Sequence, residues 1–119
     1  SLDFITSTIK RTIGNKDLQW IFDNSAANSQ SEFPISTIKN GRMKTYIIDR
    51  TFIDQEGVRW IIDYKTGAPK DGNATEFVER QSILHAPQLI QYKELFGKLE
   101  SRQIRTALLF TSIPKLVEI

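Results

Sequence analysis

The sequence predicts a single α/β domain in which helical segments combine with a sheet of about five strands. Some segments repeat apolar residues at the three- and four-residue spacing of helices, whereas others are β-branched and aromatic runs bounded by Gly, Asn and Asp. A chain of 119 residues with 39% hydrophobic content is also large enough for one core. No internal repeat or linker divides it, so we expect one domain over residues 1–119.

The first part of the chain is expected to be a helical lead-in over residues 1–24. Apolar residues with helical spacing stand before and after Gly14-Asn15, which favours two short helices or one broken helix. The polar run Asn24–Ser31 is typical of a surface loop. Three candidate strands follow, separated by turn residues: Glu32–Ile38, Lys44–Ile53 and Val58–Thr66.

The second half is expected to hold a loop, a helix and two strands. Gly67–Asn73 is rich in Gly and does not suit a strand or a helix. Pro87 suits the first turn of a helix whose apolar stripe runs down to Leu99. Strands over Gln103–Phe110 and Leu116–Ile119 complete the expected sheet.

Composition narrows the classes of function. No run of about 18 apolar residues predicts a membrane span, and the first residues lack the pattern of a signal peptide, so we expect a soluble protein. The chain has no cysteine and a single histidine, His85. Disulfides, Cys-ligated zinc and multi-histidine metal sites within the chain are therefore excluded, and any bound metal would be held mainly by oxygen atoms.

The net charge of +2 is too small to indicate nucleic-acid binding by itself. Basic residues do cluster in two places. One cluster lies around the second strand and the other near the junction of the later helix and strand: Lys39, Arg42, Lys44 and Arg50, and Lys98, Arg102 and Arg105. Contacts with nucleic acid and ordinary solvated loops both remain open as explanations of these clusters.

Two aspartates on neighbouring strands are the candidate chemical centre. Alternate side chains of a strand share a face, so Asp63 and Lys65 point the same way. A three-residue loop, Gln55–Gly57, with Gly57 in the left-handed conformation would place Asp49 directly opposite Asp63. A two-residue loop would instead put the carboxylates on opposite faces. Along the second strand, the same alternation puts Tyr46, Ile48, Arg50 and Phe52 on the face opposite to Asp49.

Directly opposed side chains have Cβ atoms roughly 4.5–5.5 Å apart, so two carboxylates at this spacing repel and require a cation. With no cysteine and one histidine, a hard cation such as Mg²⁺ or Mn²⁺ is favoured, and its natural substrate partner is phosphate. Lys65 could orient a water or neutralise charge on the phosphate. The alternative is an ordinary exposed strand face, on which Asp-x-Lys is common.

Three short motifs follow one another along the chain: Ile48-Asp49-Arg50, then Asp63-Tyr64-Lys65-Thr66, then Gln88-Leu89-x-x-Tyr92. Together they resemble the RecB-type nuclease domain of the PD-(D/E)XK superfamily. The likeness is greatest to the carboxy-terminal nuclease of UvrD-like and AddA-like helicase-nuclease subunits, and it extends from about Glu32 to Phe110. The three motifs in order are much more specific than any one of them.

The resemblance implies a restriction-endonuclease-like core over residues 32–119, with a central mixed sheet flanked by helices. It implies catalytic roles for Asp49, Asp63, Lys65, Gln88 and Tyr92. It implies metal ligation by Asp49, Asp63 and the main-chain carbonyl of Tyr64, with Glu32 as a further candidate. It implies DNA contacts by Arg50, Thr66, Gln88 and Tyr92.

The implied activity is Mg²⁺-dependent hydrolysis of DNA, with Mn²⁺ as a substitute and exonuclease action favoured over endonuclease action. The implied partners are DNA, helicase motor domains in the same full-length chain, through which ATP would act, and a second helicase-nuclease subunit, in the bacterial cytoplasm. Relatives often carry a histidine on an upstream helix, but no histidine precedes Asp49 here. This departure favours a chain that is a fragment of a larger protein, and it keeps open a catalytically weak DNA-binding or scaffolding module.

Overall fold

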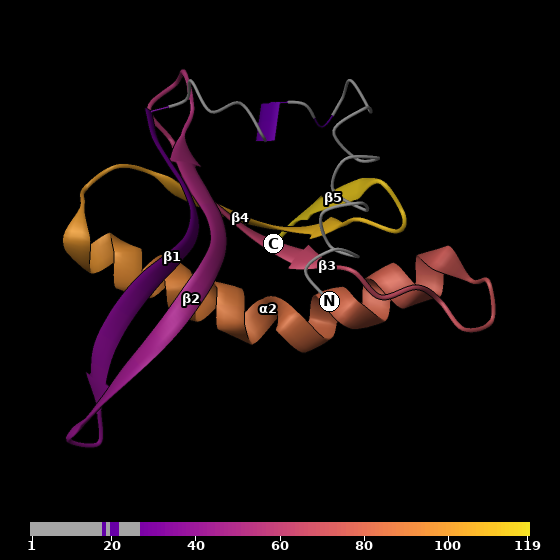
Figure 1. Cartoon of the computed structure of the whole chain (residues 1–119), viewed down its shortest axis with the longest axis horizontal. Coiled ribbons are helices and arrows are strands. Elements are labelled where there is room, and N and C mark those ends of the chain that lie inside the picture. The colour runs from indigo at the N-terminus through magenta and orange to yellow at the C-terminus, as the bar shows by residue number, and fades with distance from the viewer. Residues whose placement is uncertain (1–17, 19, 22–26) are drawn as a thin grey trace.

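Five strands form one sheet, and each strand lies beside the next one in the chain (Figure 1). This computed structural model describes Leu18, Trp20, Ile21 and residues 27–119. The elements in order are β1 (Ala27–Lys39), β2 (Arg42–Ile53), β3 (Arg59–Lys65), α2 (Ala74–Leu99), β4 (Ile104–Phe110) and β5 (Lys115–Glu118). Strands β3 and β4 are parallel and the other neighbours are antiparallel. The predicted α/β class with a five-stranded mixed sheet is confirmed.

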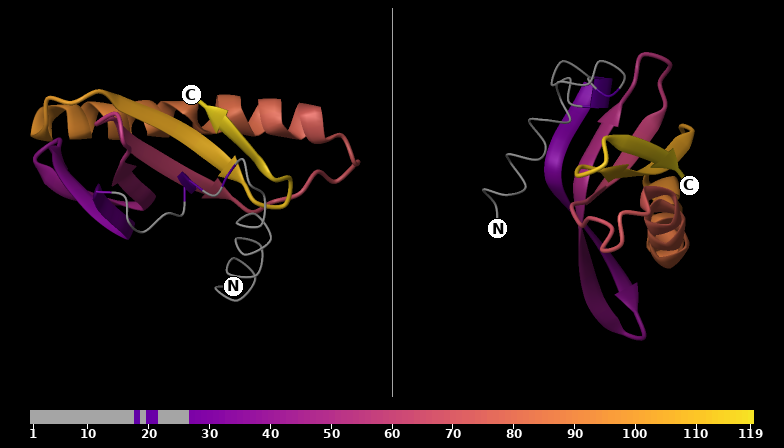
Figure 2. Two further views of the ribbon diagram at one scale, coloured as in Figure 1. Left: turned by 90° about the horizontal axis from the view of Figure 1, so that it is seen from above. Right: turned by 90° about the vertical axis from the view of Figure 1, so that its right-hand side faces the viewer.

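The helix α2 connects the two parallel strands and lies against one face of the sheet (Figure 2). The core cluster between sheet and helix includes Ile61, Leu108 and Phe110 from the strands and Leu89 and Phe96 from α2. On the opposite face of the sheet, a second cluster is joined by two residues that precede β1, Leu18 and Ile21. Both faces of β3 and β4 are therefore buried, which agrees with the almost continuous apolar sequence of β4. The rest of the predicted lead-in of residues 1–24 lies outside the described residues.

The helix begins earlier than the sequence analysis predicted. It starts at Ala74 and contains Pro87 in its interior instead of its first turn. The side chain of Asn73 caps it by accepting a hydrogen bond of 3.0 Å from the backbone N–H of Glu76. This cap, with an acidic residue in the first turn, starts the helix well before Pro87, and the helix continues through the proline. In the described part of the chain, no helix is long and apolar enough to cross a membrane.

Strand β1 also begins earlier than predicted, because it includes Ala27 to Ser31, part of the expected surface loop. A register shift lies between the pairs that Ala27 and Gln30 make with β2. The polar composition of this stretch fits its place at the edge of the sheet, since β2 is the one strand beside β1 among the described strands. Ser29 and Ser31 also accept hydrogen bonds from β2.

The hairpin of β1 and β2 extends beyond the rest of the sheet as a two-stranded ribbon (Figures 1 and 2). Strand β2 pairs with β3 only from Arg50 to Ile53, whereas it pairs with β1 along its whole length. The prediction that Tyr46 and Ile48 share a face with Phe52 is wrong, because they pack in the cluster beneath α2 and Phe52 packs in the other cluster. Two-stranded ribbons twist strongly, and Glu32 on the neighbouring strand has a φ of 53° here, so the ribbon turns its face toward the helix.

Candidate active site

The β2–β3 turn sets the geometry of the candidate site. The N–H of Asp54 donates to the Val58 carbonyl at 2.8 Å, and the N–H of Gly57 donates to the Asp54 carbonyl at 3.1 Å. Gly57 has a φ of 81°, the left-handed conformation that the predicted three-residue loop requires. The loop and its register are confirmed, since Arg50 pairs with Ile62. The paired register ends at Arg50 and Ile62, and just beyond it the Asp49 side chain reaches the Tyr64 N–H and the Asp63 carboxylate.

The two carboxylates are held by hydrogen bonds and an ion pair. Oδ2 of Asp49 accepts a hydrogen bond of 2.8 Å from the backbone N–H of Tyr64. The Nζ atom of Lys65 lies 2.9 Å from Oδ2 of Asp63, and these two side chains are 19% and 15% exposed. A cation therefore compensates the opposed carboxylates, as the sequence predicted, and here it is the lysine on the same strand.

The proximity of the carboxylates changes the pKa of Asp49. Burial and a hydrogen bond with Asp63 raise this pKa to about 7, although the Tyr64 N–H and the Lys65 ammonium act in the opposite direction. Near neutral pH Asp49 therefore carries a proton for part of the time, and it is mostly charged only above that range.

The helix α2 adds polar groups above the carboxylates. Tyr92 is 4% exposed, and its pKa rises to about 12 because of burial and of the negative charges of Asp63 and Asp49. Its ring packs edge-to-face against Tyr46, with centroids 5.7 Å apart. The pKa of His85 is lowered by burial and by the Lys65 ammonium, which places this histidine near the same site.

Gln91 is a residue of this region that the sequence analysis missed. Its Nε2 donates a hydrogen bond of 3.0 Å to the Tyr46 hydroxyl. Gln88, which the sequence predicted beside Tyr92 at the site, is exposed, and Thr66 is half-buried just after β3. The glutamine that contacts Tyr46 is therefore Gln91. The sequence does not show which of Gln88 and Gln91 faces the site until the rotation of α2 about its axis is known.

Arg50, for which the resemblance implies a DNA contact, is buried in the structure. It is 4% exposed and its Nε donates to the Ile21 carbonyl at 2.6 Å, while an Nη atom donates to Ser29 Oγ at 2.7 Å. The guanidinium also lies 5.8 Å from the ring centroid of Phe52. These contacts lie on the sheet face opposite to α2, so Arg50 connects β2 to β1 and to Ile21, and its DNA contact stays a prediction.

The oxygen donors of the site fit a hard cation. Asp49 and Asp63 are two carboxylates on facing strands, and the N–H of Tyr64 points toward Asp49. The N–H and C=O of one strand residue point to the same edge, so the Tyr64 carbonyl is directed to this side as well. Mg²⁺ binds through a few carboxylates and keeps several waters, which matches this small donor set.

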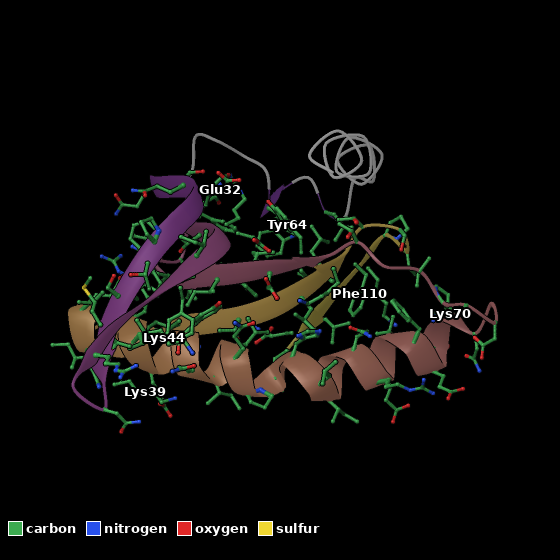
Figure 3. The ribbon with its side chains drawn as sticks, turned by 60° about the horizontal axis from the view of Figure 1, so that its bottom comes forward. Glu32, Lys39, Lys44, Tyr64, Lys70 and Phe110 are labelled. Atoms are coloured by element: carbon green, nitrogen blue, oxygen red, sulfur yellow. The ribbon has the colours of Figure 1, made fainter. Side chains whose placement is uncertain are left out.

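Glu32 does not join these donors. Figure 3 shows Glu32 on β1 and Tyr64 on β3, and the Glu32 side chain is exposed. Within residues 27–119 and the three residues described before them, no three Asp, Glu or His side chains come together. Glu32 lies between the residues that pair with Arg50 and Ile48, so it stands across from Asp49 on the neighbouring strand, but its side chain is exposed and does not join the two aspartates.

Comparison of the chain with protein-family models gave no match, and a search of curated proteins gave none.

Proposed function

We propose that this chain is a metal-dependent deoxyribonuclease domain of the RecB type, with a restriction-endonuclease-like core. The observation that carries the proposal is the pair of opposed aspartates, Asp49 and Asp63, with Lys65 in contact on the same partly buried face. Two neighbouring carboxylates repel each other and do not stabilise a strand pair, so the arrangement suits a function that needs both of them. Within the same proposal the domain acts as an exonuclease beside helicase motor domains in a bacterial cytoplasm.

Each residue of the site has its own role in the proposed reaction. Asp49, Asp63 and the Tyr64 carbonyl would hold Mg²⁺, which supplies Lewis-acid stabilisation of phosphate charge and lowers the pKa of a bound water. Lys65 would stabilise the charge that develops on the scissile phosphate, since its ammonium already lies beside this site. The ion pair with Asp63 would loosen as the lysine turns toward the phosphate. Tyr92 would orient the substrate through its hydroxyl from the helix above.

The second candidate is a catalytically weak module that binds DNA without cutting it. One observation favours it, because the Lys65–Asp63 ion pair of 2.9 Å also satisfies both charges without any metal. In that case the pair would be a structural device of the hairpin. The two candidates differ in whether loss of Asp63 removes an activity or only weakens the fold.

The test measures the cleavage of labelled DNA in Mg²⁺, with EDTA in the metal-free blank. It compares the wild type with Asp63→Ala and with a control variant, Glu94→Ala, which removes an exposed carboxylate from α2. We expect Asp63→Ala to abolish metal-dependent cleavage and to melt at the wild-type temperature or above, because like-charge repulsion with Asp49 is relieved. The control should cut normally. Cleavage by Asp63→Ala at the wild-type rate, or unfolding of this variant alone, would refute the site, and a wild type that binds but never cuts would favour the second candidate.

A further inference from the structure

The free end of the β1–β2 ribbon projects past α2 (Figures 1 and 2). Its strands are joined by Asn40-Gly41, which have φ values of 52° and 75°. Positive φ at both turn residues gives the tight two-residue turn that continues the twist of a ribbon. The tip is therefore an ordered extension of the sheet.

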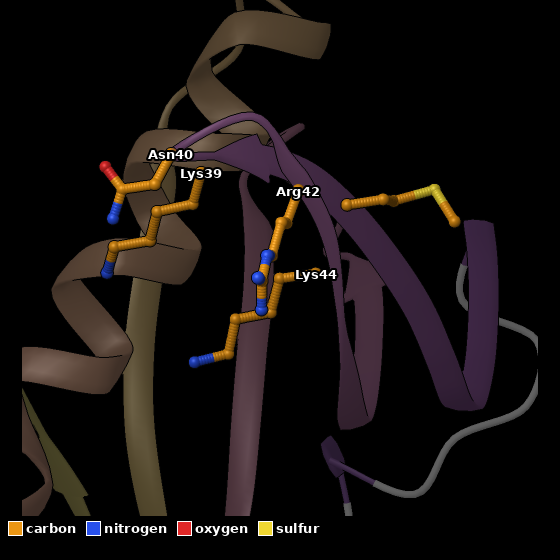
Figure 4. A pocket seen from close by; sticks show the side chains of 5 residues that line it. Lys39, Asn40, Arg42 and Lys44 are labelled. Carbon is orange, nitrogen blue, oxygen red and sulfur yellow. The ribbon is translucent and has the colours of Figure 1, made fainter.

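The register shows which side chains share a face of this tip. Lys39 pairs with Arg42, and Lys44 pairs with Thr37. These pairs alternate with Ile38 and Met43, which are paired with each other and are 77% and 76% exposed on the opposite face. Figure 4 shows the side chains of Lys39, Arg42 and Lys44 extending to the same side of the ribbon, where they line a shallow hollow.

The cationic face is the one that the ribbon turns toward α2. Two residues further along β2, Tyr46 lies on this face and packs beneath the helix. Lys44 Nζ lies 5.0 Å from the centroid of the Tyr46 ring, and Tyr46 in turn contacts Tyr92. A chain of contacts from Lys44 through Tyr46 to Tyr92 thus links the cationic end of the ribbon to α2.

Among the described residues these cations have no acidic partner. In the described part of the chain, none of Lys39, Arg42 and Lys44 lies within an ion pair, although five ion pairs occur elsewhere. The sequence also contains no Asp or Glu between Glu32 and Asp49. A patch of three uncompensated cations on a projecting element is suited to an anionic partner with regularly spaced charges.

We infer that Lys39, Arg42 and Lys44 bind the phosphate backbone of DNA and hold the strand that leads to the aspartate pair. The inference rests on the proposed function, and it names the surface that receives the substrate. A strand rises about 3.3 Å per residue, so the ribbon from Arg42 to Asp49 spans about 23 Å. Phosphates of one duplex strand follow at about 3.4 Å along the axis, so contacts at the tip would lie about seven base pairs from the site of cutting.

The test measures the binding of the whole 119-residue chain to a fluorescein-labelled 20-base-pair duplex, and to the same single strand, in EDTA over a series of salt concentrations. The variant replaces Lys39, Arg42 and Lys44 by Gln. The control removes the same charge elsewhere, by Lys70→Gln, Lys93→Gln and Lys115→Gln, all of which are exposed. Lys70 lies at the other end of the molecule from Lys39 and Lys44 (Figure 3).

We expect the ribbon variant to bind more weakly, with a log–log salt slope shallower by about 2.7 on the duplex and about 2.1 on the single strand. The control should change the slope little, and both variants should melt like the wild type. Equal slopes in the ribbon variant and the wild type, equal losses in both variants, or no DNA binding by the wild type would overturn the inference.

Cleavage in Mg²⁺ separates this inference from the proposed function. A wild type that cuts DNA, with a ribbon variant that binds as the wild type does, keeps the nuclease and refutes the ribbon. A ribbon variant with a shallower slope, in a protein that never cuts, keeps the DNA-binding surface and refutes the nuclease.

Discussion

Asp49 is the residue whose charge links stability to pH. Its pKa of about 7 lies above the value of 3.8 that is usual for an aspartate in an unfolded chain, so the folded state binds more protons between these values. Stability from this residue is therefore greatest at low pH and declines as pH rises from about 4 to about 7. Above that range, the charged Asp49 opposes folding beside Asp63.

Asp49→Asn should remove this opposition. We expect the variant to exceed the wild type in free energy of unfolding at pH 8 by about 2 kcal/mol, after allowance for solvent screening at a partly exposed site. At pH 4 the two proteins should have nearly equal stability. Urea unfolding in EDTA at both pH values would check this, with Glu94→Gln as the control. A gain that is the same at both pH values would contradict the raised pKa.

Lys65 should matter more for turnover than for affinity. Its ammonium is fixed beside Asp63 at 2.9 Å, whereas DNA would contact several other cations. We expect Lys65→Ala to lower turnover by about 100-fold and to change DNA affinity by less than about threefold. Single-turnover cleavage together with binding in EDTA measures the two effects. Unchanged turnover with weakened binding would reverse the assignment.

At the level of single residues, the sequence predicted which side chains share a face where strand alternation determines it. Asp63 and Lys65 share a face, and the turn chemistry of Gly57 brought Asp49 opposite to them. Arg50 was not predictable in this way, because its partners include the Ile21 carbonyl, which is distant in the sequence. The contrast between Gln88 and Gln91 depends on the rotation of a helix about its axis, which local sequence does not determine.

Among the elements, the β2–β3 turn fixes the register of the site. We expect Gly57→Ala to destabilise the domain by about 1–2 kcal/mol, because Ala is disfavoured at a φ of 81° even though nothing lies within 4 Å of the added Cβ. Gly97→Ala is the matched control, since it also meets open space but stands in α2, where Ala stabilises by about 0.5–1 kcal/mol. Denaturant unfolding measures both variants. A Gly57→Ala protein as stable as the wild type would show that the left-handed turn is not required.

The early start of α2 had a signal in the sequence. Asn73 followed by Glu76 is a capping pattern, and it stands directly after the Gly-rich loop. The prediction instead placed the start at Pro87, because proline is common in first turns. The prolonged β1 had no comparable signal, since the polar residues from Ala27 to Ser31 become a strand only by pairing with β2 and accepting bonds from Arg50.

For the whole molecule, strands joined by short turns could be predicted as neighbours, because such turns connect antiparallel pairs. The parallel pairing of β3 with β4 is consistent with the crossover through α2. The direction of the ribbon could not be predicted, since it depends on how much twist the two-stranded segment accumulates and on the positive φ of Glu32, which local sequence does not determine. This direction is what brings the cationic face onto the side of the aspartates.

The central claim is that Asp49 and Asp63 form a metal centre, and thermal melting with Mn²⁺ tests it most directly. With a dissociation constant on the order of 1 mM, 10 mM Mn²⁺ should stabilise the wild type by about 1.4 kcal/mol and raise its melting temperature by about 5 °C at pH 8. Asp63→Asn should show no such rise, and Glu94→Gln should respond like the wild type. A wild type whose melting temperature does not change with Mn²⁺, or an Asp63→Asn variant that gains as much as the wild type, would contradict the claim.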